Sequence, residues 1–157
     1  MVILGIDPGT TRIGYGVIIK KNSQLFYQTN GVIETRGTHL EKLISLSSQL
    51  SDLITKVKPE LVGIETIFFS VNKKTAISVA QARGVILHTV AMRGIPITEP
   101  SPSEVKLAVT GNGNATKDAV AKMVHHFLNN SSPLLSTIDD AMDALAIAIT
   151  ISNKKPS

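Results

Sequence analysis

The order in which strand-like and helix-like hydrophobic patterns follow one another constrains the fold of this chain more than any other feature. Three strand-like segments come first, over residues 2–6, 13–19 and 24–35. The first two are joined by a tight turn at Pro8-Gly9, and the third is expected to carry a bulge at Gly31. These segments predict an antiparallel meander.

Helical spacing begins in the next segment. Apolar residues recur at three- and four-residue steps from Leu40 and Ile44 to Val57, which predicts that they share one buried helical face. Thr38 and Glu41 can form a capping box at the start of this helix. Beyond it we expect a strand over 61–64, a helix over 74–92, a strand over 95–97, and helices over 103–110, 117–128 and 139–151.

This order, β-β-β-α-β-α-β followed by helices, predicts an α/β fold with a mixed five-stranded sheet flanked by helices. The length of 157 residues suits a single domain, expected over 1–151, and residues 152–157 are expected to form a flexible basic tail. Contents of 43% apolar and 18% charged residues exclude a disordered or low-complexity chain.

The charge balance makes nucleic acid a candidate partner. The net charge is +4, and its excess lies within residues 66–117, where six Lys and Arg face only Glu99 and Glu104. The chain has no cysteine, which excludes a disulfide scaffold, a thiolate metal site and a cysteine nucleophile, and favours a reducing compartment. No apolar run approaches a membrane span, and residues 1–6 are typical of a strand rather than a secretory signal, so we expect a cytoplasmic protein.

Two acidic residues stand at the ends of predicted strands. Asp7 ends the first strand and Glu65 ends the fourth, and ligand sites commonly lie at the carboxyl ends of strands in open α/β sheets. A carboxylate among apolar neighbours is costly to desolvate unless a cation or a set of donors compensates it. A simple turn role before Pro8 is the alternative for Asp7.

A second acidic group opens the last helix. The helix dipole accounts for an acid in the first turn, which covers Asp139 and Asp140. It does not cover Asp143, which precedes a stretch that is apolar nearly all round. Asp143 shares a helical face with Asp140 and also with Asp139, so the spacing leaves both pairs open.

Four carboxylates that converge would repel one another unless divalent cations lay among them. Mg²⁺ takes oxygen ligands, and two such ions about 3.5–4 Å apart can activate a water and stabilise the leaving oxygen of a phosphodiester. The leading chemistry is therefore hydrolysis of nucleic acid.

Several motifs together resemble the RuvC family of bacterial Holliday junction resolvases. They are Gly5-Ile6-Asp7-Pro8-Gly9, Thr11-Arg12-Ile13-Gly14-Tyr15-Gly16, Ile64-Glu65 with Phe68, Ala80-Gln81-Ala82-Arg83-Gly84, Val105-Lys106, Thr110-Gly111-Asn112-Gly113, Ala115-Thr116-Lys117 and Asp140-Ala141-Met142-Asp143-Ala144-Leu145-Ala146. The resemblance spans nearly the whole chain. It implies the RNase H-like fold of the retroviral integrase superfamily.

The same resemblance implies an activity and its partners. We expect a homodimer that binds four-way junction DNA and makes paired symmetric nicks during recombination and repair. Two Mg²⁺ per active site are expected, with Mn²⁺ as a substitute, and a branch-migration complex of the RuvA and RuvB type is the expected partner.

The resemblance also assigns residues. The acidic pair of the last helix becomes Asp140 and Asp143, with Asp139 as a helix-start residue, so the catalytic and metal-binding set is Asp7, Glu65, Asp140 and Asp143. Phe68 is expected to stack on junction bases, and Lys73, Lys74, Lys106 and Lys117 are expected to contact the DNA backbone.

Three further assignments from the sequence remain to be tested. Asp118 stands where many family members carry Gln, which places a negative charge beside Lys117. The helix with Arg83 and Gly84 is assigned to the dimer interface, with packing on the chain's own sheet as the alternative. The four histidines are interpreted as structural or surface residues: His39, His88, His125 and His126.

Other functions compete with this hypothesis. The Asp7-Pro8-Gly9-Thr10-Thr11 segment is similar to the phosphate loop of the actin and Hsp70 ATPase superfamily, although those proteins need two related lobes. A catalytically silent junction-binding protein and an RNase H-like nuclease for other substrates are the remaining alternatives.

Overall fold

The predicted meander forms one half of a five-stranded sheet in the computed structural model, which describes residues 1–67, 73–128 and 138–153. The strands are β1 (Val2–Asp7), β2 (Arg12–Lys21), β3 (Gln24–Glu34), β4 (Leu61–Ile64) and β5 (Ile97–Thr98). Their order across the sheet is β3-β2-β1-β4-β5. β1, β2 and β3 pair antiparallel, whereas β4 and β5 run parallel to β1, so the predicted mixed sheet is confirmed.

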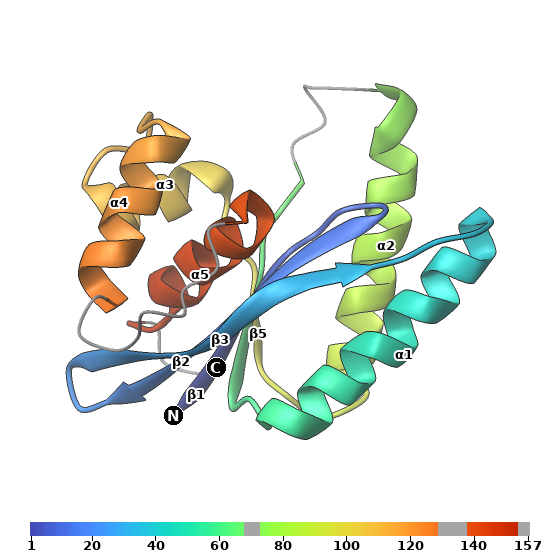
Figure 1. Ribbon diagram of the computed structural model, residues 1–157, viewed down its shortest axis with the longest axis horizontal. Helices are drawn as coiled ribbons and strands as arrows, with labels where there is room; N and C mark the ends of the chain where they lie inside the picture. Colours follow the sequence, from blue (N-terminus) through green and yellow to red (C-terminus); the bar gives the residue numbers. More distant parts are fainter. Residues whose placement is uncertain (68–72, 129–137, 154–157) are drawn as a thin grey trace.

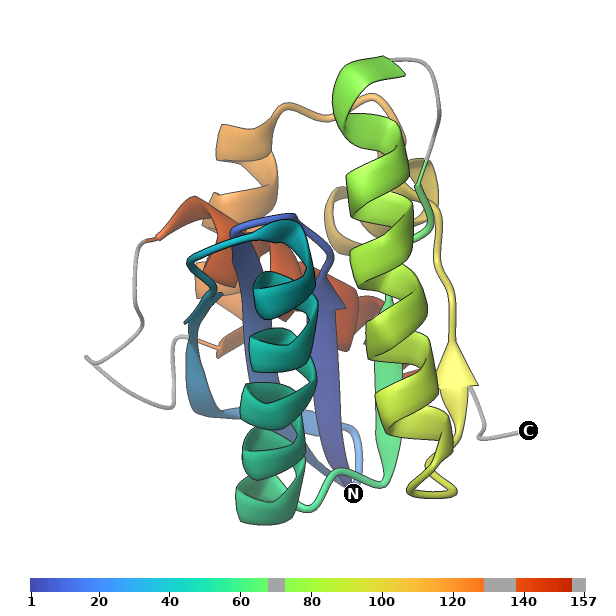
Figure 2. The ribbon, with the colours of Figure 1, turned by 90° about the vertical axis from the view of Figure 1, so that its right-hand side faces the viewer.

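Five helices cover the two faces of this sheet. They are α1 (His39–Val57), α2 (Lys73–Ala91), α3 (Pro102–Thr110), α4 (Lys117–Leu128) and α5 (Asp139–Ile151). α1 and α2 lie side by side on one face, and α3, α4 and α5 lie on the other (Figures 1 and 2). A separate hydrophobic core lies on each side of the sheet. Within the described ranges, none of the helices has the length and hydropathy that a membrane span requires.

The bulge of the third strand lies at a different residue from the predicted one. Val17 pairs with Thr29 and Ile18 pairs with Tyr27, so Gln28 is the extra residue, while Gly31 stays in the regular ladder opposite Tyr15. Gln28 is exposed, and its insertion leaves Tyr27 packed against the core. A bulge here therefore places the polar residue in solvent.

α1 begins as predicted but buries a narrower face. Both hydrogen bonds of the capping box are present: the Thr38 N–H donates to the Glu41 carboxylate, and the Glu41 N–H donates to the Thr38 hydroxyl. The residues that α1 buries are Leu46, Leu50, Ile54 and Val57. Leu40 and Ile44 were expected on the same face but are 66% and 61% exposed, because they lie on a neighbouring stripe that lines an outer groove between α1 and α2.

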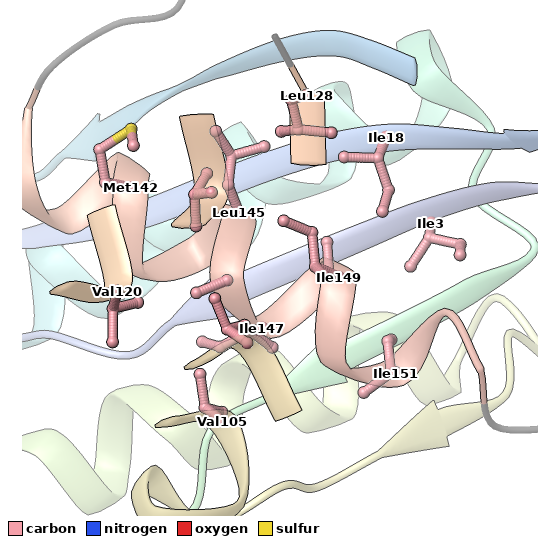
Figure 3. Packing of buried hydrophobic residues seen from close by; sticks show 14 of the residues in the cluster. Ile3, Ile18, Val105, Val120, Leu128, Met142, Leu145, Ile147, Ile149 and Ile151 are labelled. Carbon is pink, nitrogen blue, oxygen red and sulfur yellow. The ribbon is translucent and has the colours of Figure 1, made fainter. Parts of the chain in front are cut away.

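α5 packs directly against the backbone of the sheet. A Cβ atom on Gly5 would lie 2.0 Å from the carbonyl oxygen of Ala144, and one on Gly14 would lie 1.9 Å from that of Asp140. Only glycine allows so close an approach, and α5 is buried nearly all round, as predicted. Figure 3 shows its apolar residues filling the core between the sheet and the other two helices, among them Leu145, Ile147, Ile149 and Ile151.

Candidate active site

The pleat of the sheet places Asp7 and Glu65 on the face that α5 covers. Side chains alternate along a strand, and Gly5, two residues before Asp7, contacts α5. On β4, Gly63 likewise faces Ile147 and Ile151 of α5, and Glu65 follows two residues later. Because Ile6 pairs with Ile64 in parallel register, Asp7 and Glu65 emerge next to each other. The prediction that these two acids meet at the strand ends is confirmed.

The first turn of α5 brings two more carboxylates to this edge. The backbone of Asp140 sits on Gly14 of β2, so the start of the helix is fixed over the ends of β1 and β2. Asp143, one turn further along, lines a cavity that also contains Asp7 and Glu65. Asp139 is exposed and lines a neighbouring groove instead.

The cavity that the acids share has a volume of about 300 Å³. Its polar lining consists of three acids and two lysines, Asp7, Glu65, Asp143, Lys106 and Lys117. Its apolar lining is contributed by Pro102, Val105, Val120 and Ala146. Asp140 is not among the lining residues, although it was predicted to belong to the same set. The structure therefore brings three of the four predicted acids together in one cavity and places the fourth at its margin.

Burial and mutual repulsion make the acids of this cavity hard to ionise. Burial, followed by the charges of Glu65, Asp143 and Asp140, raises the pKa of Asp7 to about 7. Burial and the charge of Asp143 raise the pKa of Glu65 to about 7, against the opposing effect of Lys117 and Lys106. The cavity thus has a deficit of positive charge near neutral pH.

Lysines supply part of the missing positive charge. Lys117, the first residue of α4, donates a hydrogen bond from Nζ to Oδ2 of Asp143 over 3.0 Å, and this bond raises the pKa of Lys117. Lys106 of α3 is half-buried at the cavity wall. Asp118 pairs with Lys122 over 2.9 Å, one turn along α4, so its charge has a partner other than Lys117.

Sequence reasoning missed two arginines at this site. Arg12 of β2 donates from Nε to Oδ2 of Asp140 over 3.0 Å. The alternation that puts Gly14 against α5 also puts Arg12 on that face, so the sequence contained a signal for this contact. Arg83 of α2 donates from Nε to the main-chain oxygen of Glu65 over 3.0 Å and pairs with Glu99.

The structure describes the side chains of only some of the residues predicted to contact DNA. Lys106 and Lys117 line the cavity with the acids. Phe68 lies outside the described residues. Lys73 and Lys74 are the first two residues of α2, and their side chains also lie outside the described part of the chain. These three assignments stay predictions.

The histidines lie away from the floor of the cavity. His39, His88 and His126 are exposed, as expected for surface residues. His125 is half-buried and lines the groove next to the cavity, together with Asp139 and Met142.

The chemistry of the donor set fits a divalent cation. Carboxylate oxygens are the ligands that Mg²⁺ prefers, and a cation among Asp7, Glu65 and Asp143 would relieve the repulsion that raises two of their pKa values. Within residues 1–67, 73–128 and 138–153, no three acidic or histidine side chains already have the geometry that holds a metal ion. Oδ2 of Asp143 accepts the bond from Lys117, and the second oxygen of this carboxylate can bind the ion.

Comparisons of sequence place this chain among known nucleases. The family model described as crossover junction endodeoxyribonuclease RuvC matches residues 3–151. A protein of that name from Brachyspira hyodysenteriae is 46% identical over 95% of this chain and 92% of its own length. Another, from Prochlorococcus marinus, is 45% identical over 96% of this chain and 97% of its own length.

Comparisons of structure agree. Thermus thermophilus RuvC superposes with a TM-score of 0.84 at 31% identity, over 96% of this chain and 92% of that one. A structure of the same protein in complex with a Holliday junction substrate matches equally well. The yeast mitochondrial Holliday junction resolvase Ydc2 matches with a TM-score of 0.68 at 17% identity, over 94% of this chain and 76% of that one, which shows a shared fold.

Proposed function

The chain belongs to the RuvC family of crossover junction endodeoxyribonucleases, and from this premise we infer that it is an endonuclease that resolves Holliday junctions in DNA recombination and repair. The observation that carries this function is the cavity in which Asp7, Glu65 and Asp143 meet two lysines. Family membership also sets aside the ATPase hypothesis drawn from the Asp7–Thr11 segment, because the family's members are nucleases.

The activity depends on a divalent metal, as is typical of the family. We propose two Mg²⁺ ions per active site, held by Asp7, Glu65, Asp140 and Asp143, with Mn²⁺ as a substitute. When bound, the ions lower the pKa of a water and stabilise charge on the phosphate oxygens. The raised pKa values of Asp7 and Glu65 support this proposal, because they show a site that lacks positive charge.

The basic residues of the cavity are proposed to hold the DNA backbone. Lys117 is 74% exposed at its side chain, so it can turn from Asp143 toward a phosphate. Lys106 contributes a second ammonium group at the cavity wall. We keep Lys73 and Lys74 as backbone contacts and Phe68 as the residue that stacks on bases at the junction.

We also propose that the protein acts as a homodimer, since paired nicks require two active sites on one junction. The groove between α1 and α2 supports a second copy there. Leu40 and Ile44 line this groove and are 66% and 61% exposed, and Ile77 of α2 is 70% exposed; such apolar groups favour a protein partner. A Cβ on Gly84 would meet open space at the same surface, so another chain can approach closely.

Three more assignments follow from the family. We propose that residues 1–151 form one nuclease domain, because the family model spans nearly the same range. Since the named relatives are bacterial nucleases that act on DNA, we place the protein in the bacterial cytoplasm. A branch-migration complex of the RuvA and RuvB type is its proposed partner.

Cleavage of an immobile four-way junction tests the function. We expect paired nicks in opposite strands with Mg²⁺ and none with EDTA. Asp7→Asn should abolish cleavage and leave junction binding intact. Binding without cleavage by the unmodified protein would support the silent binding alternative, and equal cleavage of linear duplex or RNA–DNA hybrid would support a nuclease for other substrates.

A further inference from the structure

We propose that Arg12 is a positioning residue that holds Asp140 at the margin of the cavity in the free protein and releases it when DNA arrives. The inference rests on the proposed function, since it concerns how the metal site becomes complete. Arg12 lies within one of the motifs that the sequence shares with the family, but no role at the active site was predicted for it. The contacts of four side chains carry it.

Each carboxylate at the start of α5 has its own basic partner. Lys117 donates to Asp143 over 3.0 Å, and Arg12 donates to Asp140 over 3.0 Å. The two cations come from different elements, α4 and β2. Asp143 faces the cavity with Asp7 and Glu65, whereas Asp140 does not line it. The acid that pairs with Lys117 therefore lies in the cavity, whereas the acid that pairs with Arg12 lies outside its lining.

The backbone positions on both sides of the Arg12–Asp140 pair are fixed. Arg12 is paired across the sheet with Glu34, whose carboxylate lies 3.9 Å from its guanidinium. Asp140 sits on Gly14, where not even a methyl group would fit, so the start of α5 cannot move closer to β2. Any change in which groups Asp140 contacts must therefore come from rotation of the side chains.

The pair is exposed enough to be exchanged. The side chain of Arg12 is 49% exposed and that of Asp140 is 36% exposed, and ion pairs in contact with solvent contribute little to stability. A guanidinium binds phosphate oxygens with two parallel hydrogen bonds, as it binds a carboxylate. A phosphate that approaches Arg12 can therefore replace Asp140.

This exchange would couple the metal site to DNA. In the free protein Arg12 competes with metal ions for Asp140, and Asp140 and Asp143 share one helical face, so a released Asp140 side chain can turn toward the cavity. A complete ligand set then forms only where phosphate occupies Arg12. The proposed role thus restricts full metal loading to the DNA complex.

The first test measures metal binding without DNA, by titration calorimetry with Mn²⁺. We expect Arg12→Ala to bind Mn²⁺ about two- to fivefold more tightly than the unmodified protein, the size expected for loss of one partly exposed ion pair. Arg36→Ala is the matched control, because Arg36 pairs with Glu34 and is not paired with Asp140. In an Asp140→Asn background, Arg12→Ala should have no effect.

The second test measures junction binding in Ca²⁺ over a range of salt concentrations. Arg12→Ala should reduce the slope of log affinity against log salt by about one, and Arg12→Lys should restore it. If Arg12→Ala does not fold, Arg12→Gln, which removes the charge and keeps a polar side chain, gives the same two readouts.

The outcomes separate this inference from the proposed function. A protein that neither binds Mn²⁺ nor cleaves a junction contradicts the proposed function. A protein that does both, but whose Mn²⁺ affinity is the same with and without Arg12, overturns only the role of Arg12. Tighter Mn²⁺ binding by Arg12→Ala that persists in the Asp140→Asn background overturns it as well.

Discussion

The Asp7 carboxyl favours its protonated form in the folded protein, with a pKa of about 7 against an ordinary 3.8. The folded state therefore binds a proton that the unfolded state has lost, and the free energy of unfolding falls as the pH rises from about 4 to 7. Asp7→Asn removes the free-energy cost of ionising this buried carboxyl. In EDTA at pH 8 the variant should therefore be more stable than the unmodified protein by about 1–3 kcal/mol. Urea unfolding at pH 5 and pH 8 measures the difference, which should be smaller at pH 5.

Two controls support that measurement. Asp52→Asn, at an exposed position on α1, should leave the free energy of unfolding within about 0.5 kcal/mol at both pH values. Mg²⁺ should stabilise the unmodified protein and not Asp7→Asn, because an ion that binds only the folded state stabilises it. Equal stability of the Asp7→Asn variant and the unmodified protein at pH 8 would show that Asp7 carries no such cost.

The sequence predicted the acidic residues of the site better than the basic residues that bond to them. Asp7 and Glu65 could be assigned because both end apolar strands, and Asp143 because an acid precedes a buried helix. The spacing left Asp139 and Asp140 undecided, and only the family resemblance selected Asp140, whose backbone lies on Gly14 while Asp139 lines a neighbouring groove. Arg83 could not be assigned, since its bond to the Glu65 carbonyl depends on how α2 lies across β4.

Among the elements, α5 depends on the glycines beneath it. Gly5→Ala would place a Cβ 2.0 Å from the Ala144 carbonyl oxygen, so α5 must move away from β1. We expect a loss of about 3 kcal/mol or more in the free energy of unfolding, together with loss of cleavage, because Asp143 moves with the helix. Gly113→Ala is the control: its Cβ would meet Ser103 at an ordinary 3.5 Å. A Gly5→Ala variant of unchanged stability would contradict this account of the packing.

The end of β4 is held in place from α2. Arg83→Ala removes the donor to the main-chain oxygen of Glu65 and should let this residue shift within the cavity. We expect cleavage to fall by about 10- to 100-fold, in the range seen when a group that orients a metal ligand is lost. The Mg²⁺ concentration for half-maximal rate should rise, and junction binding should stay the same.

Two variants decide whether Arg83 acts through Glu65. Arg83→Lys should restore part of the activity, because it keeps a donor and a charge. Arg93→Ala removes another arginine near the end of α2, one that donates to Thr55, and should leave the Mg²⁺ dependence unchanged. An Arg83→Ala variant that loses activity without a change in Mg²⁺ dependence would indicate a general structural role.

Whether a segment forms a helix or a strand was easier to predict from sequence than which of its faces is buried. Hydrophobic patterns predicted a segment for each described helix and strand, although the strand expected over 95–97 overlaps β5 only at Ile97, and the capping box indicated the start of α1. Leu40 and Ile44 nevertheless point into the outer groove, because apolar spacing does not distinguish a face that meets the sheet from one that meets another protein. The same limit applies to the bulge, which lies at Gln28, the residue left out of the strand pairing, rather than at a glycine.

Across the whole molecule, positive charge near the acidic group comes from separate parts of the chain. The sequence placed the basic excess within residues 66–117, which includes Lys106 and Lys117. Arg12 and Arg36 stand outside that segment, and the fold brings Arg12 to the other end of the acidic group at Asp140. A DNA backbone bound at the cavity would therefore find cations from β2 as well as from α3 and α4.

The proposed homodimer predicts how the two nicks depend on each other. Ile44→Glu puts a charge on the exposed apolar surface of α1, and burial of an unpaired charge between two copies is costly. We expect this variant to be monomeric by light scattering, to fold normally because Ile44 is 61% exposed, and to lose paired nicking while single nicks persist. Leu107→Glu is the matched control, since Leu107 is 55% exposed on α3, across the sheet from the groove, and should leave the dimer intact. If Ile44→Glu and the unmodified protein have the same mass in solution, the second copy must bind elsewhere, and the apolar groove between α1 and α2 must serve a different partner.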